Sequence, residues 1–174
     1  GSYGTGNDYG DGLFPELLKR ISRRTNFWPP LYLMYVGSVL EQKGHKVDYS
    51  NDISGCDNYD AIIMSSSIVC HETEIDAIRQ IGDKSKIIVV GSFVTNNPKN
   101  YLNEGVRIIK GEPEFYFLNN SLDEIMTTRK SYILIETSDK TNLDVLPFPC
   151  WDKIKNLSFS GTIFKKTCIP ILAE

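Results

Sequence analysis

The chain has 174 residues, of which 41% are hydrophobic and 24% are charged, and its formal net charge at pH 7 is −3. These values are typical of a globular domain with one real core. The negative charge argues against nucleic acid or an anionic membrane as a partner. No apolar run approaches the roughly 18 residues of a transmembrane helix, so no membrane partner is expected.

The cysteines are widely scattered and form no C-x-x-C pair; they are Cys56, Cys70, Cys150 and Cys168. Because the amino-terminal residues are Gly-rich and polar, with no signal peptide, we expect reduced thiols in a cytoplasmic protein. Closed zinc sites usually carry closely spaced ligand pairs, so no metal site is predicted.

Residues 1–26 predict a loop rich in Gly, Asn and Asp, followed by a helix over residues 13–24. A Gly-x-Gly at residues 4–6 suggests a phosphate loop only weakly, because no apolar strand precedes it. The prolines before Leu31 suit the entrance of a second helix over residues 31–43.

The stretch from Tyr59 to Phe93 predicts a parallel unit. Two apolar runs, at residues 61–66 and 86–91, are typical of buried strands. Between them, isoleucines recur every three residues and predict an amphipathic helix. A strand, a helix and a strand within so few residues indicate a right-handed parallel crossover.

The same alternation extends to both sides of this unit. Further strands are predicted at residues 46–50 and 106–110, with a short helical segment at 96–102 and a helix at 115–118 whose first turn Pro113 can occupy. The pattern predicts an α/β fold with a doubly wound, flavodoxin-like (Rossmann-like) parallel sheet. Such a sheet has a central first strand before the helix at 31–43, but no apolar run supplies it. Either the chain starts inside the domain or an irregular segment takes that place.

The sequence changes character after about residue 130. A strand is predicted at residues 132–136, and the proline-punctuated residues 142–149 exclude a regular helix or central strand. Residues 161–172 alternate weakly and suggest extended structure. We therefore divide the chain into an amino-terminal part (1–26), an α/β domain (27–130) and a covering arm or linker (131–174).

Ligands of open parallel sheets bind beyond the carboxyl ends of the strands. Three such ends carry small or polar residues, and the candidate binding residues are Ser65, Ser66, Ser67, Ile68, Gly91, Ser92, Phe93, Val94, Gly111, Glu112 and Glu114. Serine hydroxyls can bond amides, and glycines admit a close ligand. The same residues would also serve as the tight turns that every such fold needs.

Three motifs together resemble a known domain. Pro29-Pro30-Leu31, then Gly44-His45-Lys46-Val47-Asp48, then the run LDVLPFPCW at residues 143–151 resemble the cobalamin-binding domain of cobalamin-dependent radical S-adenosylmethionine enzymes. The resemblance covers roughly residues 27–152. It implies a corrinoid held between this domain and a radical domain of the same parent chain. That radical domain would carry the [4Fe–4S] cluster and S-adenosylmethionine of a methyltransferase-like enzyme.

The chain departs from known cobalamin domains at several points. The D-x-H-x-x-G motif, whose histidine ligates cobalt in other cobalamin domains, is missing, but cobalt in the resembled family often lacks a protein histidine. Ser92 stands where a second glycine is usual, and Pro113 replaces a glycine. The cluster motif C-x-x-x-C-x-x-C is also missing, so this chain is expected to be the amino-terminal part of a longer enzyme and not to catalyse radical chemistry alone. The alternative is a cofactor-free interaction or regulatory domain that docks a partner through Trp28, Phe148 and Trp151.

Overall fold

The computed structural model describes residues 30–50, 53–68, 70–128 and 142–154, together with the short strands at residues 134–136, 162–163 and 166–167. The helices are α2 (Leu31–Gln42), α3 (His71–Gln80), α4 (Ser92–Asn96), α5 (Lys99–Leu102), α6 (Pro113–Asn119) and α7 (Leu122–Thr127). The strands are β1 (Ile62–Ser65), β2 (Ile87–Val90), β3 (Arg107–Lys110), β4 (Leu134–Glu136), β5 (Thr162–Ile163) and β6 (Lys166–Thr167). Single 3-10 turns occur at Cys56–Asn58, Lys84–Lys86, Leu143–Val145 and Trp151–Ile154.

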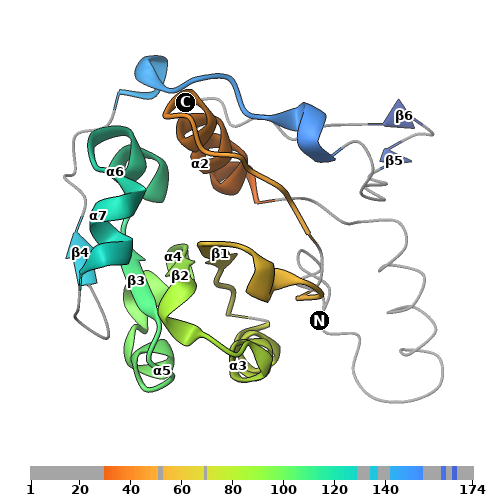
Figure 1. The fold of residues 1–174 in the computed structure, drawn as a ribbon. Helices are drawn as coiled ribbons and strands as arrows, with labels where there is room; N and C mark the ends of the chain where they lie inside the picture. The colour runs from red at the N-terminus through yellow and green to blue at the C-terminus, as the bar shows by residue number, and fades with distance from the viewer. Residues whose placement is uncertain are drawn as a thin grey trace.

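The central sheet has the order β1-β2-β3-β4, and all of its neighbouring strands are parallel (Figure 1). Ile62 pairs with Ile87, and Ile108 pairs with Leu134. Strands β5 and β6 form a separate antiparallel pair. The predicted α/β class with a parallel sheet is therefore confirmed.

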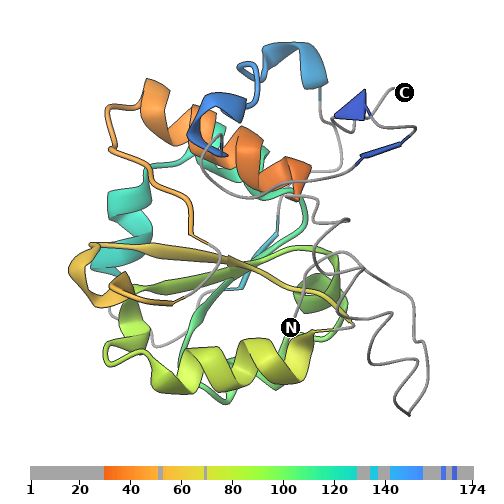
Figure 2. The same ribbon diagram turned by 90° about the vertical axis from the view of Figure 1, so that its right-hand side faces the viewer.

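Helices cover both faces of the sheet, which explains the continuous apolar strands (Figure 2). On one face, α2, α6 and α7 pack on Ile88, Val90 and Ile109. On the other face, α3 and α5 pack on the remaining strand residues, including Val89 and Ile108. Since successive strand residues point to opposite faces, one short apolar run supplies both cores.

Residues 142–154, part of the predicted arm, lie along α2. The Ser38 hydroxyl donates a hydrogen bond of 2.7 Å to the Phe148 carbonyl, and the Cys150 thiol donates one of 3.0 Å to the Met34 carbonyl. Gly37 permits this contact, because a Cβ there would lie 2.9 Å from the Cys150 sulfur. This part of the arm therefore covers α2.

Some predicted elements differ from the structure. The strand prediction at residues 46–50 is wrong, because these residues form no strand. The helix at 96–102 is two helices, and α4 begins earlier, at Ser92. Helix α7 was not predicted, although Ser121 caps it by accepting a hydrogen bond from the Asp123 amide. Strand β4 joins the sheet beyond the boundary drawn at residue 130. The predicted helix at 13–24 lies outside the described residues.

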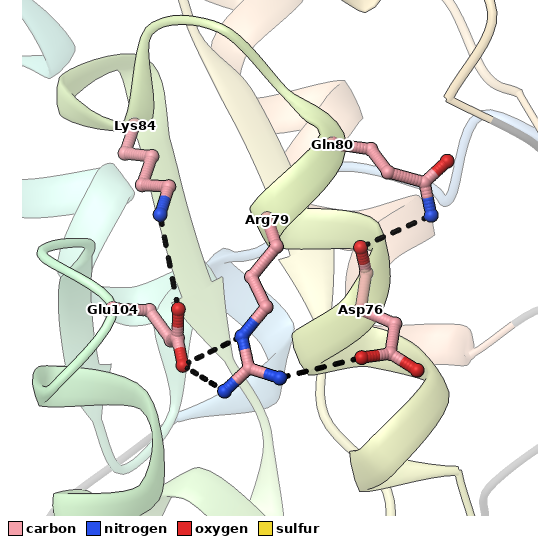
Figure 3. Close-up of polar contacts among 5 residues, drawn as sticks. All are labelled: Asp76, Arg79, Gln80, Lys84 and Glu104. Atoms are coloured by element: carbon pink, nitrogen blue, oxygen red, sulfur yellow. Dashed lines mark hydrogen bonds and ion pairs between the residues drawn. The ribbon is translucent and has the colours of Figure 1, made fainter.

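An ion-pair network joins α3 to the turn before β3 (Figure 3). Arg79 donates from Nη2 and Nε to one oxygen of Glu104, at 2.8 Å and 3.1 Å, and contacts Asp76 at 3.4 Å. Lys84 lies 3.8 Å from the second Glu104 oxygen. The Arg79 guanidinium lowers the pKa of the Glu104 carboxyl.

We expect Glu104→Gln to lower the midpoint of thermal unfolding by about 1–2 °C at pH 7, because surface pairs contribute little. Since the folded-state pKa of Glu104 is lowered, its contribution is present above the unfolded pKa and is lost as pH falls through the folded value. The difference between variant and wild type should therefore vanish in acid. Asp76→Asn, which removes only the longer contact, is the control. A difference that persists in acid would contradict this assignment.

Candidate functional site

The carboxyl ends of β1 and β2 are joined by hydrogen bonds through Ser66. Its backbone N–H donates to the Val90 carbonyl at 2.8 Å, and its hydroxyl oxygen accepts from the Val94 N–H at 2.9 Å. Ser65 and Ser66 are each only 6% exposed. Ser66 therefore positions the first turn of α4, so it has a structural role whether or not it also contacts a ligand.

The ends of β2 and β3 are joined in the same way by Thr95. Its hydroxyl donates to the Gly91 carbonyl at 2.8 Å and accepts from the Gly111 N–H at 3.1 Å. Gly91 has φ +114, and a Cβ there would lie 2.7 Å from the Tyr32 hydroxyl of α2. Thr95 and Tyr32 were not among the predicted site residues. Thr95 ends the strand-end segment 91–95 but was not chosen as a contact, and nothing in the sequence marked Tyr32, because each acts through a contact with another segment.

The buried carboxyl group of Glu74 binds the backbone of Ser67, the residue that follows Ser66. Glu74 of α3 is 3% exposed, and one of its oxygens accepts hydrogen bonds from the Ser67 N–H and the Tyr101 hydroxyl. Its other oxygen is buried and has no hydrogen-bond partner among the described residues. Burial raises the pKa of the Glu74 carboxyl. Sequence reasoning missed Glu74, because no local pattern separates a buried helical glutamate from an exposed one.

We call the three linked strand ends, residues 65–68, 91–95 and 111–112, the platform. Its exposed members are Ile68, Ser92 and Glu112, and Ile68 is 71% exposed. Phe93 is partly buried, with its ring centroid 5.1 Å from that of His71. The exposed side chains of the platform are thus one large apolar side chain, one hydroxyl and one carboxylate.

The remaining predicted site residues lie beneath this surface or at its margin. Val94 is fully buried, and Glu114 is 6% exposed. Ser67 and Gly111 are partly buried. The structure therefore brings the predicted residues of all three strand ends together, but it leaves only some of them accessible to a ligand.

Glu114 occupies the first turn of α6, directly after Pro113. One of its carboxylate oxygens is buried and has no hydrogen-bond partner among the described residues. Burial raises the pKa of the Glu114 carboxyl to about 7, and the Glu112 carboxylate acts in the same direction. The folded protein therefore holds a proton that the unfolded chain releases near the ordinary glutamate pKa of about 4.3.

The raised pKa of Glu114 determines the direction in which the stability of the folded protein changes with pH. Because the folded pKa is raised, the contribution of Glu114 is most favourable below about pH 4.3 and is lost as pH rises to about 7. We expect Glu114→Gln to be more stable than the wild type by about 2–4 kcal/mol at pH 8, and by much less at pH 5. Urea unfolding at both pH values measures this. Glu72→Gln is the matched control, since that side chain is exposed on α3 and does not act on Glu114. An equal effect of Glu114→Gln at both pH values would contradict the assignment.

The chain matches no protein-family model, and comparisons with curated proteins and with solved structures gave no significant match. Within the described residues, no group of three or more His, Cys, Asp or Glu side chains could hold a metal ion. The described helices also include none with the length and apolar character of a membrane span. The cysteines of the described part, Cys56, Cys70 and Cys150, form no disulfide.

Proposed function

We propose that this chain is a corrinoid-binding module of a longer, cytoplasmic, radical S-adenosylmethionine methyltransferase-like enzyme. The supporting observation is the platform, in which three strand ends are tied into one surface by Ser66 and Thr95. A corrin ring is broad and has apolar faces, so it needs an open surface with an apolar contact. Ile68 would provide that contact, and Phe93 is a partly buried aromatic residue of the same platform.

The polar groups around the platform suit the periphery of a corrinoid. Its side chains carry amides, which can accept from the Ser92 hydroxyl or donate to Glu112. The corrinoid would supply methyl-group transfer, while this chain would bind and orient it. The [4Fe–4S] cluster, S-adenosylmethionine and the second wall of the site would belong to the radical domain of the parent enzyme.

A hydroxocobalamin titration followed by visible absorption tests this function. We expect a spectral shift on binding, and co-elution of the colour with the protein in gel filtration. Ile68→Glu should weaken binding by about tenfold or more, since it places a charge against an apolar ring face. Val145→Glu is the matched control, because Val145 is also exposed but lies on the arm. Absence of any shift, or equal weakening by both variants, would count against the corrinoid module.

The second candidate is a cofactor-free interaction domain. Phe148 is 93% exposed on the arm, and Val145 is 53% exposed beside it. Of the other aromatics expected to dock a partner, Trp151 is partly buried, and Trp28 lies outside the described residues. This function predicts no corrinoid binding and an apolar surface that binds a hydrophobic fluorescent dye. Phe148→Ser should reduce the dye signal, whereas Ile68→Ser should leave it unchanged.

A further inference from the structure

A cavity of about 850 Å³ lies between β1, α2 and residues 45–50. Ala61 and Ile63 of the β1 segment line one side, and Val36 and Leu40 of α2 line another. Val47 lines a third side. Apolar side chains therefore face the cavity from three separate segments of the chain.

Strand β1 lies at the edge of the sheet (Figure 1), and its residue Ile63 lines the cavity. It pairs with β2 on one side, and no described residue pairs with its other side. Ile62, Ile63 and Met64 are only partly buried, whereas their partners in β2 are fully buried. A strand edge presents a row of N–H and C=O groups that favours pairing with another strand.

Residues 45–50 face the cavity from the opposite side and have the burial pattern of a strand. His45, Val47 and Tyr49 are partly buried, and the residues that alternate with them are exposed. This period of two is the period of an extended strand. The sequence predicts a strand here, yet none forms, because no described strand lies next to these residues to pair with them.

We propose that this cavity is a docking slot for one additional peptide strand, which pairs with β1 on one side and with residues 46–50 on the other. The unpaired backbone of β1 needs a backbone partner, and this favours an extended peptide over a small molecule. Every strand of the sheet is parallel, so the added strand runs parallel to β1.

The chemistry of the occupant follows from its surroundings. Val36 and Leu40 of α2, with Leu122 and Met126 of α7, form an apolar wall of the slot, and polar residues such as Ser54, Asn58 and Asp60 also line it. The side chains of an added strand that face the apolar wall are therefore apolar, and Val and Ile are favoured in strands. The proposed occupant is therefore an extended peptide of about five or six residues with an apolar face toward α2.

A capped peptide with about five alternating valines and isoleucines between terminal lysines is a suitable probe. We expect it to raise the midpoint of thermal unfolding by roughly 3–6 °C at about ten times its Kd. Amide exchange at residues 62–65 and 46–50 should slow by about tenfold or more. The matched control peptide carries proline at its central position and cannot pair through that residue. Equal effects of both peptides would overturn the proposal.

A cavity-filling variant provides an independent test. Ala61→Phe places a ring in the slot, and we expect it to abolish the response to the peptide without lowering stability. Val145→Phe, on the arm, should keep the full response. Peptide binding that leaves exchange at residues 62–65 unchanged would overturn the proposal. Dimerisation of the chain through β1, seen by sedimentation, would also overturn it, because the edge would then belong to a second copy.

Discussion

Replacing Gly91 with Ala is expected to lower the free energy of unfolding by about 2–4 kcal/mol. Gly91 has φ +114, where a residue with a Cβ is strained by about 1–2 kcal/mol. The new Cβ would also lie 2.7 Å from the Tyr32 hydroxyl and 3.2 Å from the Ser66 carbonyl oxygen. Because one neighbour is backbone, the contact cannot be relieved by rotating a side chain alone. Urea unfolding measures the loss.

The matched control for this substitution is Gly44→Ala. Gly44 also has a positive φ, +90, but a Cβ there would meet nothing within 4 Å. The control therefore carries the backbone strain without the close contact, and it should cost only about 1–2 kcal/mol. Equal losses for the two variants would show that the contact with Tyr32 and Ser66 contributes nothing. The platform would then not require glycine at residue 91 for close packing.

Arg107→Met is expected to destabilise the protein by about 2–4 kcal/mol. Arg107 is 6% exposed in β3, and its guanidinium donates hydrogen bonds to the carbonyls of Ile125, Met126 and Thr128 at 3.1–3.3 Å. These carbonyls lie at the carboxyl end of α7, where a cation is favourable and the last acceptors of a helix need partners. Methionine keeps an apolar side chain there but satisfies none of them.

Amide hydrogen exchange shows which part of the protein Arg107→Met destabilises. In Arg107→Met, the amides of α7 should exchange faster than those of α3. The lost hydrogen bonds involve only carbonyls at the carboxyl end of α7. Lys110→Met, a change at the partly exposed end of the same strand, is the control and should have a small effect. Uniform acceleration across both helices, or no loss of stability, would contradict the capping role of Arg107.

The candidate site was only partly predictable from sequence. The positions of residues 65–68, 91–94 and 111–112 at the strand ends followed from the apolar runs that precede them, and the parallel sheet brings them together. The sequence did not reveal which of these residues are accessible to a ligand. Val94 and Ser66 became buried because α4 begins at Ser92, directly after the strand, and its first turn hydrogen-bonds back to β1.

Local sequence by itself determined the α/β class, strands β1, β2 and β3 of the sheet, the strand character of β4, and helices α2, α3 and α6. Hydrophobic periodicity and apolar run length are local properties, and burial on both faces makes them strong. Only the tertiary structure decided the roles of Tyr32, Glu74 and Arg107, whose partners lie far away in the chain. The tertiary structure also decided that residues 46–50 form no strand. A strand exists only when a neighbour completes its hydrogen bonds, and no local pattern supplies that neighbour.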